Sequence, residues 1–321
     1  MPDESLHQPH DKLFRATFSD PANAAAFLRN HLSGTFPSFV DWDSIRAVPG
    51  SFVDPEMSGL EADLLFSAKV GATDTLFYLL WEHQRTEDPH MSLRLLVYMA
   101  RIWQKQCENQ KSNVRLSPIL PLVLAQDKDP WKSSLSFHKM FSFPEKGREL
   151  LYSCTPDFAF RLLQLVEIPY QDIRGTPEGI LTLRSLKAAP AGELMEDPVW
   201  DASLITGISR EAVERFFRYV LNANVDKEAF KAKVSGLSSN KLTTLAMTLA
   251  ESLRQEGRQE GIQAGAHSLT LATLDVLELR FGAVPQGLAA ALSALKDLDR
   301  LNALHKAALT CGDIESFATG L

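Results

Sequence analysis

Cysteine is scarce in this chain. Among 321 residues only Cys107, Cys154 and Cys311 occur, and they lie far apart. No metal-ligand spacing links them, so they do not indicate a structural zinc site, and their odd number is not that of a disulfide framework. We therefore expect free thiols in a reducing compartment, with the cytoplasm as the location.

Long hydrophobic runs are also missing. The most apolar stretch, residues 118–125, is far shorter than the ~20 residues that a membrane-spanning helix needs. The N-terminal segment is polar and acidic, and it contains no apolar stretch that could serve as a signal peptide. We expect no membrane partner.

Positive charge is in short supply, since 33 Lys and Arg face 40 Asp and Glu, for a net charge of −7. This argues against a protein that coats nucleic acid with its whole surface. It does not exclude a nuclease, because metal-binding carboxylates are themselves negative. If DNA is the partner, the binding charge must be local. Arg94, Arg101 and Lys105 recur at helical spacing and are the best candidates for DNA contacts, although a solvated helix face would show the same pattern.

The chain also lacks a nucleotide-binding glycine loop and a Ser-His-Asp arrangement. What it does contain is an alternation of helical and strand-like segments, which predicts an α/β or α+β fold with a mixed sheet and a mainly helical C-terminal region. Asp20 followed by Pro21 predicts that one helix ends and a second begins there. The expected helices cover residues 10–31 and 89–110; the expected strands cover residues 50–54, 62–70, 75–84, 119–125 and the later part of 158–168.

The C-terminal part differs in character, which suggests a division into residues 1–240 and a helical tail, residues 241–321. Within the tail, Gly257, Gly261 and Gly265 are spaced four residues apart. A glycine inside a helix costs ~1 kcal/mol relative to alanine. One explanation is that residues 241–266 form a helix whose glycine strip lets two chains approach closely as a homodimer. A flexible hinge is the alternative.

The residues that carry chemistry lie in the hairpin formed by the second and third expected strands. If its turn is centred between residues 72 and 73, Asp63 stands directly opposite Glu82, with Cβ atoms about 5 Å apart on one face. Strand alternation puts Gln84 on that face and His83 on the other. Two carboxylates this close can hold Mg²⁺ or another divalent cation. Acids exposed at strand ends in water are the alternative.

The order Asp, then Glu-x-Gln, has the form of the PD-(D/E)XK nuclease signature, in which the acids bind metal and the third residue polarises water. Gln84 stands where lysine is usual, and an amide can only orient water or phosphate by hydrogen bonds. Lys69 cannot replace it, because six strand residues place it roughly 20 Å from Asp63.

Together these segments resemble the Rpn family of recombination-promoting nucleases, also described as YhgA-like transposases. The resemblance covers roughly residues 10–265. The matching segments are His10–Phe14, Gly50–Asp54, Asp63–Phe66, Glu82–Gln84, Met91–Trp103, Pro121–Leu124, Pro130–Trp131 and the glycine-containing tail.

The resemblance implies a restriction-endonuclease-like α/β core and divalent-metal-dependent DNA cleavage, with Asp63 and Glu82 as metal ligands. Gln84 would then be the third site residue, as is usual in this family. One departure concerns Gln126, which stands where relatives tend to carry histidine. Glu61 shares the strand face of Asp63 and is a further candidate ligand, or an exposed acid at a strand end.

Other polar residues near these motifs have simpler explanations. We expect His10 and Asp11 to cap or pack the first helix, and His83 and His90 to lie at the surface. Two other functions compete with the endonuclease. One is a catalytically weak nuclease fold that binds DNA or protein; the other is a three-carboxylate transposase, which the hairpin spacing argues against.

Overall fold

The computed structural model describes residues 9–48, 64–71, 76–109, 115–223 and 225–321. The chain forms two compact units, Met1–Ala246 and Met247–Leu321. The boundary between them falls within one long helix, α10 (Asn240–Phe281).

The first unit contains a mixed five-stranded sheet in the order β1-β2-β3-β4-β5. β1, β2 and β3 pair antiparallel, whereas β3, β4 and β5 pair parallel. This confirms the expected α/β class with a mixed sheet. The strands are β1 (Val40–Ala47), β2 (Leu64–Val70), β3 (Leu76–Gln84), β4 (Ile119–Ala125) and β5 (Arg161–Gln164).

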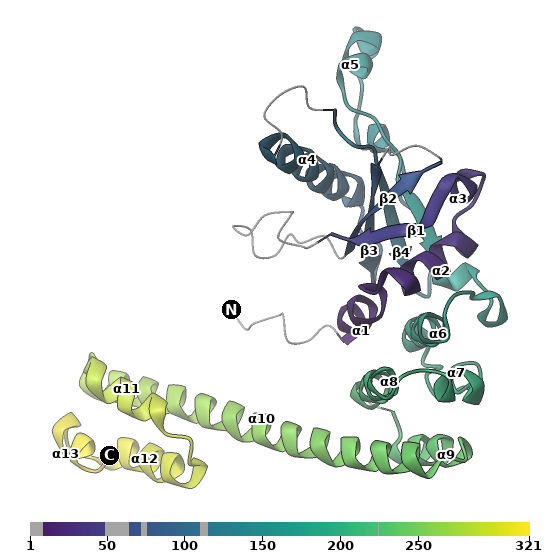
Figure 1. Cartoon of the computed structure of the whole chain (residues 1–321). Coiled ribbons are helices and arrows are strands. Elements are labelled where there is room, and N and C mark those ends of the chain that lie inside the picture. The colour runs from purple at the N-terminus through teal and green to yellow at the C-terminus, as the bar shows by residue number, and fades with distance from the viewer. Residues whose placement is uncertain (1–8, 49–63, 72–75, 110–114, 224) are drawn as a thin grey trace. The chain divides into compact units, whose positions relative to one another are not determined.

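One face of the sheet is covered by the N-terminal helices α1 (Pro9–Phe18) and α2 (Pro21–His31) (Figure 1). Asp20 caps α2 by accepting the Ala22 N–H at 2.9 Å, and Pro21 occupies the first turn, as expected from the sequence. On this face Trp81 of β3 is surrounded by aromatic rings with centroids 5.0–5.7 Å away, those of Phe14, Phe18 and Phe27.

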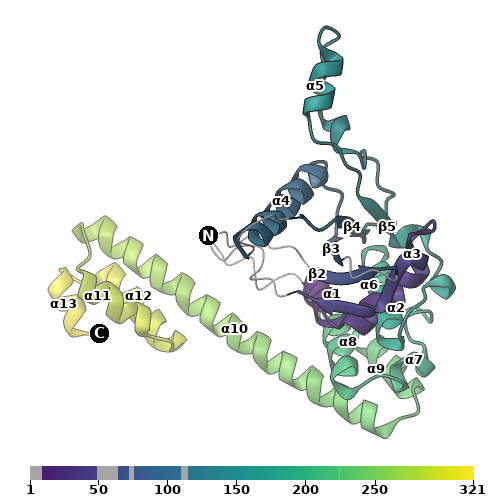
Figure 2. The same cartoon turned by 45° about the horizontal axis from the view of Figure 1, so that its top comes forward.

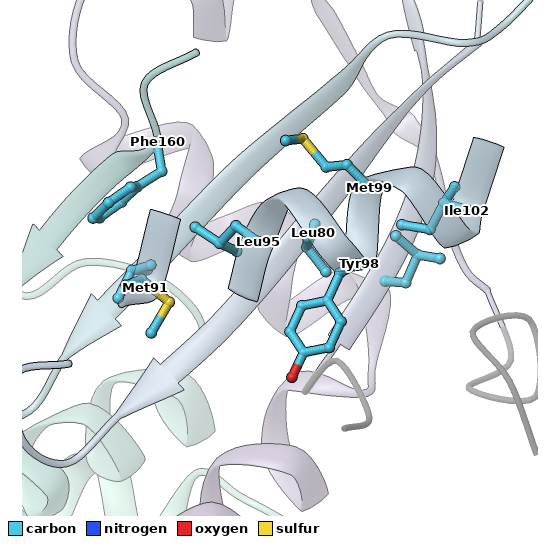
Figure 3. Close-up of a cluster of buried hydrophobic side chains, with 9 residues drawn as sticks. Leu80, Met91, Leu95, Tyr98, Met99, Ile102 and Phe160 are labelled. Atoms are coloured by element: carbon cyan, nitrogen blue, oxygen red, sulfur yellow. The ribbon is translucent and has the colours of Figure 1, made fainter. Parts of the chain in front are cut away.

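The opposite face is covered by α4 (Met91–Asn109). Its buried stripe packs on alternate residues of the central strands (Figure 3). The cluster comprises Leu65, Leu80, Met91, Leu95, Tyr98, Met99, Ile102, Val123 and Phe160. The period of the α4 stripe matches the helix predicted over residues 89–110. Successive side chains of the central strands therefore point alternately to α4 and to the N-terminal helices α1 and α2.

The hairpin register agrees with the sequence prediction. Leu64 pairs with Trp81, and Lys69 pairs with Leu76. This is the register for which the turn is centred between residues 72 and 73. β4 lies inside the sheet, as its unbroken apolar sequence predicts, and it tolerates Pro121 because its ladder with β5 begins only at Leu122.

β1 was not expected from the sequence. Only Val40 and Ile45 are buried in this strand, and its pairing with β2 shifts register between Asp41 and Arg46. The shift destroys the period-2 alternation by which a strand is recognised. The strand expected over residues 50–54 lies outside the described residues.

Further helices extend the first unit, as Figure 2 shows from a second side. α5 (Arg148–Cys154) projects away from the sheet in both views. The remaining helices and 3-10 turns are α3 (Phe36–Phe39), η3 (Phe137–Met140), α5 (Arg148–Cys154), η4 (Leu165–Glu167), η5 (Tyr170–Asp172), α6 (Pro177–Ala191), α7 (Ala202–Thr206), α8 (Arg210–Asn222) and α9 (Lys227–Gly236). In the described residues no helix combines the length and the apolar character of a membrane span.

The second unit is a small helical assembly. The C-terminal part of α10 packs with α11 (Gln286–Ala294), α12 (Leu298–Thr310) and α13 (Ile314–Thr319). Its core consists of Leu277, Leu288, Leu292, Leu304, Ala308 and Phe317.

The three spaced glycines lie inside α10, which runs unbroken through them. The helix expected over residues 241–266 is therefore present, and the hinge alternative is wrong. Among the described residues, a Cβ at Gly257 or Gly261 would meet no heavy atom within 4 Å, whereas a Cβ at Gly265 would lie 3.5 Å from Leu298 Cδ2. Self-association through this strip stays a prediction, as does the division at residue 240.

Replacing Gly257 and Gly261 by alanine should stabilise the helix by ~1 kcal/mol per site, because neither methyl meets a neighbour in the part of the chain that the structure describes. Thermal unfolding measures this gain. If the glycines pack two chains together, the same double variant should sediment as a monomer where the wild type sediments as a dimer. An unchanged sedimentation coefficient would exclude a glycine-mediated dimer.

Candidate functional site

The carboxylate of Glu82 lies buried near the C-terminal end of β3, with only 3% of its side chain exposed. Burying an unpaired carboxylate is costly. Arg94 of α4 lies beside it, and its Nη2 donates to Glu82 Oε2 at 3.2 Å. Glu82 thus points to the α4 face of the sheet, where a strand residue of its parity belongs.

Arg94 is itself held by a second acid. Its Nη1 donates to Asp88 Oδ2 at 3.1 Å. Asp88 Oδ1 in turn accepts the backbone N–H of His90 at 2.8 Å, immediately before α4 begins. The guanidinium is therefore positioned between a buried acid on the sheet and an acid at the helix start.

Gln84 is the last residue of β3 and is half-buried. Strand alternation places it on the same face as Glu82. Its Nε2 donates to the carbonyl of His83 at 3.0 Å. The parallel neighbours of Glu82 and Gln84 on β4 are Val123 and Ala125, so this edge is otherwise apolar on the β4 side.

Asp63, the second predicted metal ligand, lies outside the described residues, as does Glu61. Within the described ranges no group of three His, Cys, Asp or Glu side chains is arranged to hold a metal. The predicted ligand pair therefore remains a prediction.

The expectation that His83 lies at the surface is wrong. His83 is buried, and its Nδ1 lies 2.7 Å from Asp11 Oδ1. Its ring stacks on Phe14 with centroids 5.0 Å apart. Because it alternates with Glu82, it points to the α1 face, and burial follows from the helix that covers this face. His90 is exposed, as expected.

A polar cluster continues from this pair at the start of α1. His10 Nδ1 lies 2.8 Å from the Tyr219 hydroxyl and 3.1 Å from Gln126 Nε2. Gln126 is buried and also donates to the carbonyl of Leu186 at 2.9 Å. Since an amide N–H can only donate, His10 Nδ1 accepts from Gln126 and must be unprotonated. The pKa of His10 is lowered to about 4, mainly by burial and secondly by the positive charge of the nearby Arg85.

The three predicted DNA contacts differ in environment. Arg94 pairs with Glu82 and Asp88, so it belongs to the site itself. Arg101 and Lys105 are both half-buried, and Lys105 Nζ lies 3.4 Å from Glu108 Oε2. Of the three residues selected by their helical spacing, Arg94 thus lies at the site, and Arg101 and Lys105 lie further along α4.

Sequence comparison identifies the chain. The profile of a family described as "Putative transposase, YhgA-like" matches residues 8–210, which span the sheet and most of the helices around it. The chain belongs to this YhgA-like family. The expected resemblance is thereby confirmed.

Known YhgA-like relatives include nucleases and proteins named as inactive. Recombination-promoting nuclease RpnD of Escherichia coli O157:H7 is 31% identical over 166 residues, 51% of this chain and 62% of that protein. RpnA of Escherichia coli K12 is 26% identical, with 51% and 54% covered. A protein named "Putative inactive recombination-promoting nuclease-like protein YjiP", also from strain K12, is 38% identical over 90 residues, 28% of this chain and 87% of the relative.

The chain thus spans less than two thirds of the length of RpnD and RpnA. No solved structure matches it.

The lowered pKa of His10 makes stability depend on pH. The unfolded chain binds a proton at this histidine near pH 6.5, whereas the folded chain does so only near pH 4. The free energy of unfolding should therefore fall as the pH falls through this window, and His10 should contribute roughly 1–3 kcal/mol of the decrease.

Denaturant unfolding of wild type and His10→Gln at several pH values measures this share. The variant should lose less stability on acidification. His31→Gln is a parallel test, because burial also lowers the pKa of His31. The stability that His31 and His10 lose on acidification should add. Equal pH slopes for wild type and His10→Gln would contradict the assignment.

Proposed function

We propose that this protein is a metal-dependent DNA endonuclease whose site is formed by Asp63, Glu82 and Gln84. The observation that carries the proposal is the buried carboxylate of Glu82 near the end of β3, followed on the same strand face by Gln84. The chain belongs to a family in which RpnD and RpnA are named recombination-promoting nucleases.

The hairpin register supports Asp63 as the second acid. β2 and β3 pair without a shift from Lys69 and Leu76 to Leu64 and Trp81. If this register continues by one residue, position 63 stands opposite Glu82 and shares the α4 face with Leu65. Opposed residues have Cβ atoms about 5 Å apart, close enough for two carboxylates to hold one cation.

The donor set suits Mg²⁺ or another hard divalent cation. Such ions prefer carboxylate oxygens, take one or two from the protein and keep several waters. A bound cation would lower the pKa of a water and offset negative charge on the phosphodiester. The chain's own contribution would be a buried acid at the end of a rigid strand.

Hydrolysis then needs little from the remaining side chains. A water gives up one proton to solvent, its oxygen forms a bond to phosphorus while one P–O ester bond breaks, and the leaving oxygen takes a proton from solvent. The amide of Gln84 can accept from this water or donate to a phosphate oxygen, but it cannot remove a proton. It would act by orientation.

DNA is the proposed substrate, and α4 is the proposed side of approach. Arg94, Arg101 and Lys105 all belong to this helix. All three cysteines are free thiols, which suits the cytoplasm as the place of action.

A second candidate is a nuclease fold that binds DNA or protein without efficient cleavage. One observation favours it specifically: YjiP, 38% identical over part of the chain, carries "inactive" in its name. The absence of lysine at position 84 points the same way.

Plasmid nicking separates the two. We expect purified protein to nick supercoiled plasmid with Mg²⁺ and not with EDTA. Asp63→Ala and Glu82→Ala should each reduce nicking to the EDTA level, because one carboxylate leaves too few protein ligands for the cation. Circular dichroism checks that both variants are folded.

Two results would count against the enzyme. Nicking that either variant retains at the wild-type rate would remove these residues from the site. Wild-type protein that binds plasmid in a gel-shift assay without cutting it would favour the binding module.

A further inference from the structure

The proposed site lacks the positively charged lysine side chain that usually accompanies the two acids in nucleases of this signature. Gln84 cannot supply it, because its amide is neutral. A positive charge is nevertheless present at the site, on a different element. Arg94 Nη2 lies 3.2 Å from Glu82 Oε2, within an ion pair whose acid is almost fully buried.

We infer that Arg94 is a catalytic residue whose guanidinium contacts the scissile phosphate. In this way α4, which covers one face of the sheet, supplies the positive charge that position 84 of β3 lacks. The inference rests on the proposed endonuclease function and adds a residue to its site.

The position of Arg94 suits this role because it does not depend on Glu82 alone. Asp88 holds the guanidinium from the other side at 3.1 Å, and Asp88 is itself fixed by the N–H of His90. If Glu82 turned one oxygen to a metal, Arg94 would remain anchored at the start of α4. A preorganised cation of this kind needs no reorganisation when charge develops on phosphate.

The guanidinium also has donors to spare. Nη1 and Nη2 each carry two N–H groups, and the bonds to Asp88 and Glu82 use one of each. About a quarter of the side chain, 26%, is exposed. Arginine presents donors in a planar fork that matches a phosphate group.

A purely structural role makes a different prediction from a catalytic one. If Arg94 only neutralises Glu82, its loss should destabilise the fold and alter metal binding by Glu82, but it should leave the salt dependence of DNA binding unchanged. If it also contacts phosphate, a lysine placed on the same face should restore cleavage. Gln84→Lys is that lysine, because strand alternation gives positions 82 and 84 one face.

The first measurement needs no activity. A double-mutant cycle of Arg94→Met and Glu82→Gln, unfolded by denaturant in EDTA, should show a coupling of roughly tenfold or more in the unfolding equilibrium constant. Arg254→Met with Glu251→Gln is the matched control, since that pair is 3.1 Å apart but exposed, and its coupling should be far smaller. Equal coupling in both cycles would contradict the pairing of Arg94 with Glu82.

The second measurement is DNA binding with Ca²⁺ in place of Mg²⁺. Loss of one phosphate contact should lower the slope of log affinity against log salt by about one unit in Arg94→Met. Arg254→Met should leave the slope unchanged. A wild-type slope in Arg94→Met would overturn the phosphate contact even if the stability cycle shows coupling.

The third measurement is nicking with Mg²⁺. Arg94→Met should nick roughly 100-fold more slowly than wild type, and Gln84→Lys with Arg94→Met should recover at least about a tenth of the lost rate. Full activity in Arg94→Met, or no recovery in the folded double variant, would overturn the catalytic role.

Failure of this inference differs from failure of the proposed function. If the wild-type protein does not nick DNA, the endonuclease proposal fails, and a changed salt slope would still place Arg94 against phosphate in a binding protein. If the wild type nicks and Arg94→Met nicks equally well, the endonuclease stands and the role of Arg94 is wrong.

Discussion

The ion pair between Glu82 and Arg94 links the sheet to the helix that covers it. A carboxylate with 3% of its side chain exposed is tolerable only when a cation or hydrogen-bond donors satisfy it. The pair therefore requires α4 to start at one place along β3, and the apolar stripe of α4 continues the contact along the sheet. Asp88, whose carboxylate binds Arg94 and the backbone N–H of His90, completes this junction.

Consecutive residues at the end of β3 point to opposite faces of the sheet. Glu82 points to α4 and His83 to α1, so one strand end contacts the two layers that enclose the sheet. On the α1 face the hydrogen bonds form two groups, Asp11 with His83, and His10 with Gln126 and Tyr219. The two groups meet at consecutive residues of α1, so this helix connects α8 and the loop after β4 to the strand that carries the site. Alterations there would act on the site through strand position rather than through contact with a substrate.

Family membership by itself does not decide activity, since relatives are named both as nucleases and as inactive proteins. In physical terms the distinction reduces to whether two acids can share a metal and whether a positive charge stands near the phosphate. The neutral residue at position 84 removes one source of that charge. The guanidinium of Arg94 lies where it can provide another.

Much of the fold follows from local patterns. The paired helices at Asp20, the hairpin register and the stripe of α4 were predictable because each depends on neighbouring residues and a fixed period. The same alternation separated Glu82 from His83. Burial and partners could not be predicted. An arginine at helical spacing looks the same in sequence whether water or a buried acid surrounds it, and a histidine one residue from an acid gives no sign of the helix above it. Only the packing of α1 and α4 onto opposite faces decided that His83 is enclosed and that Arg94 meets Glu82, because both contacts join elements whose separation is set by the whole core.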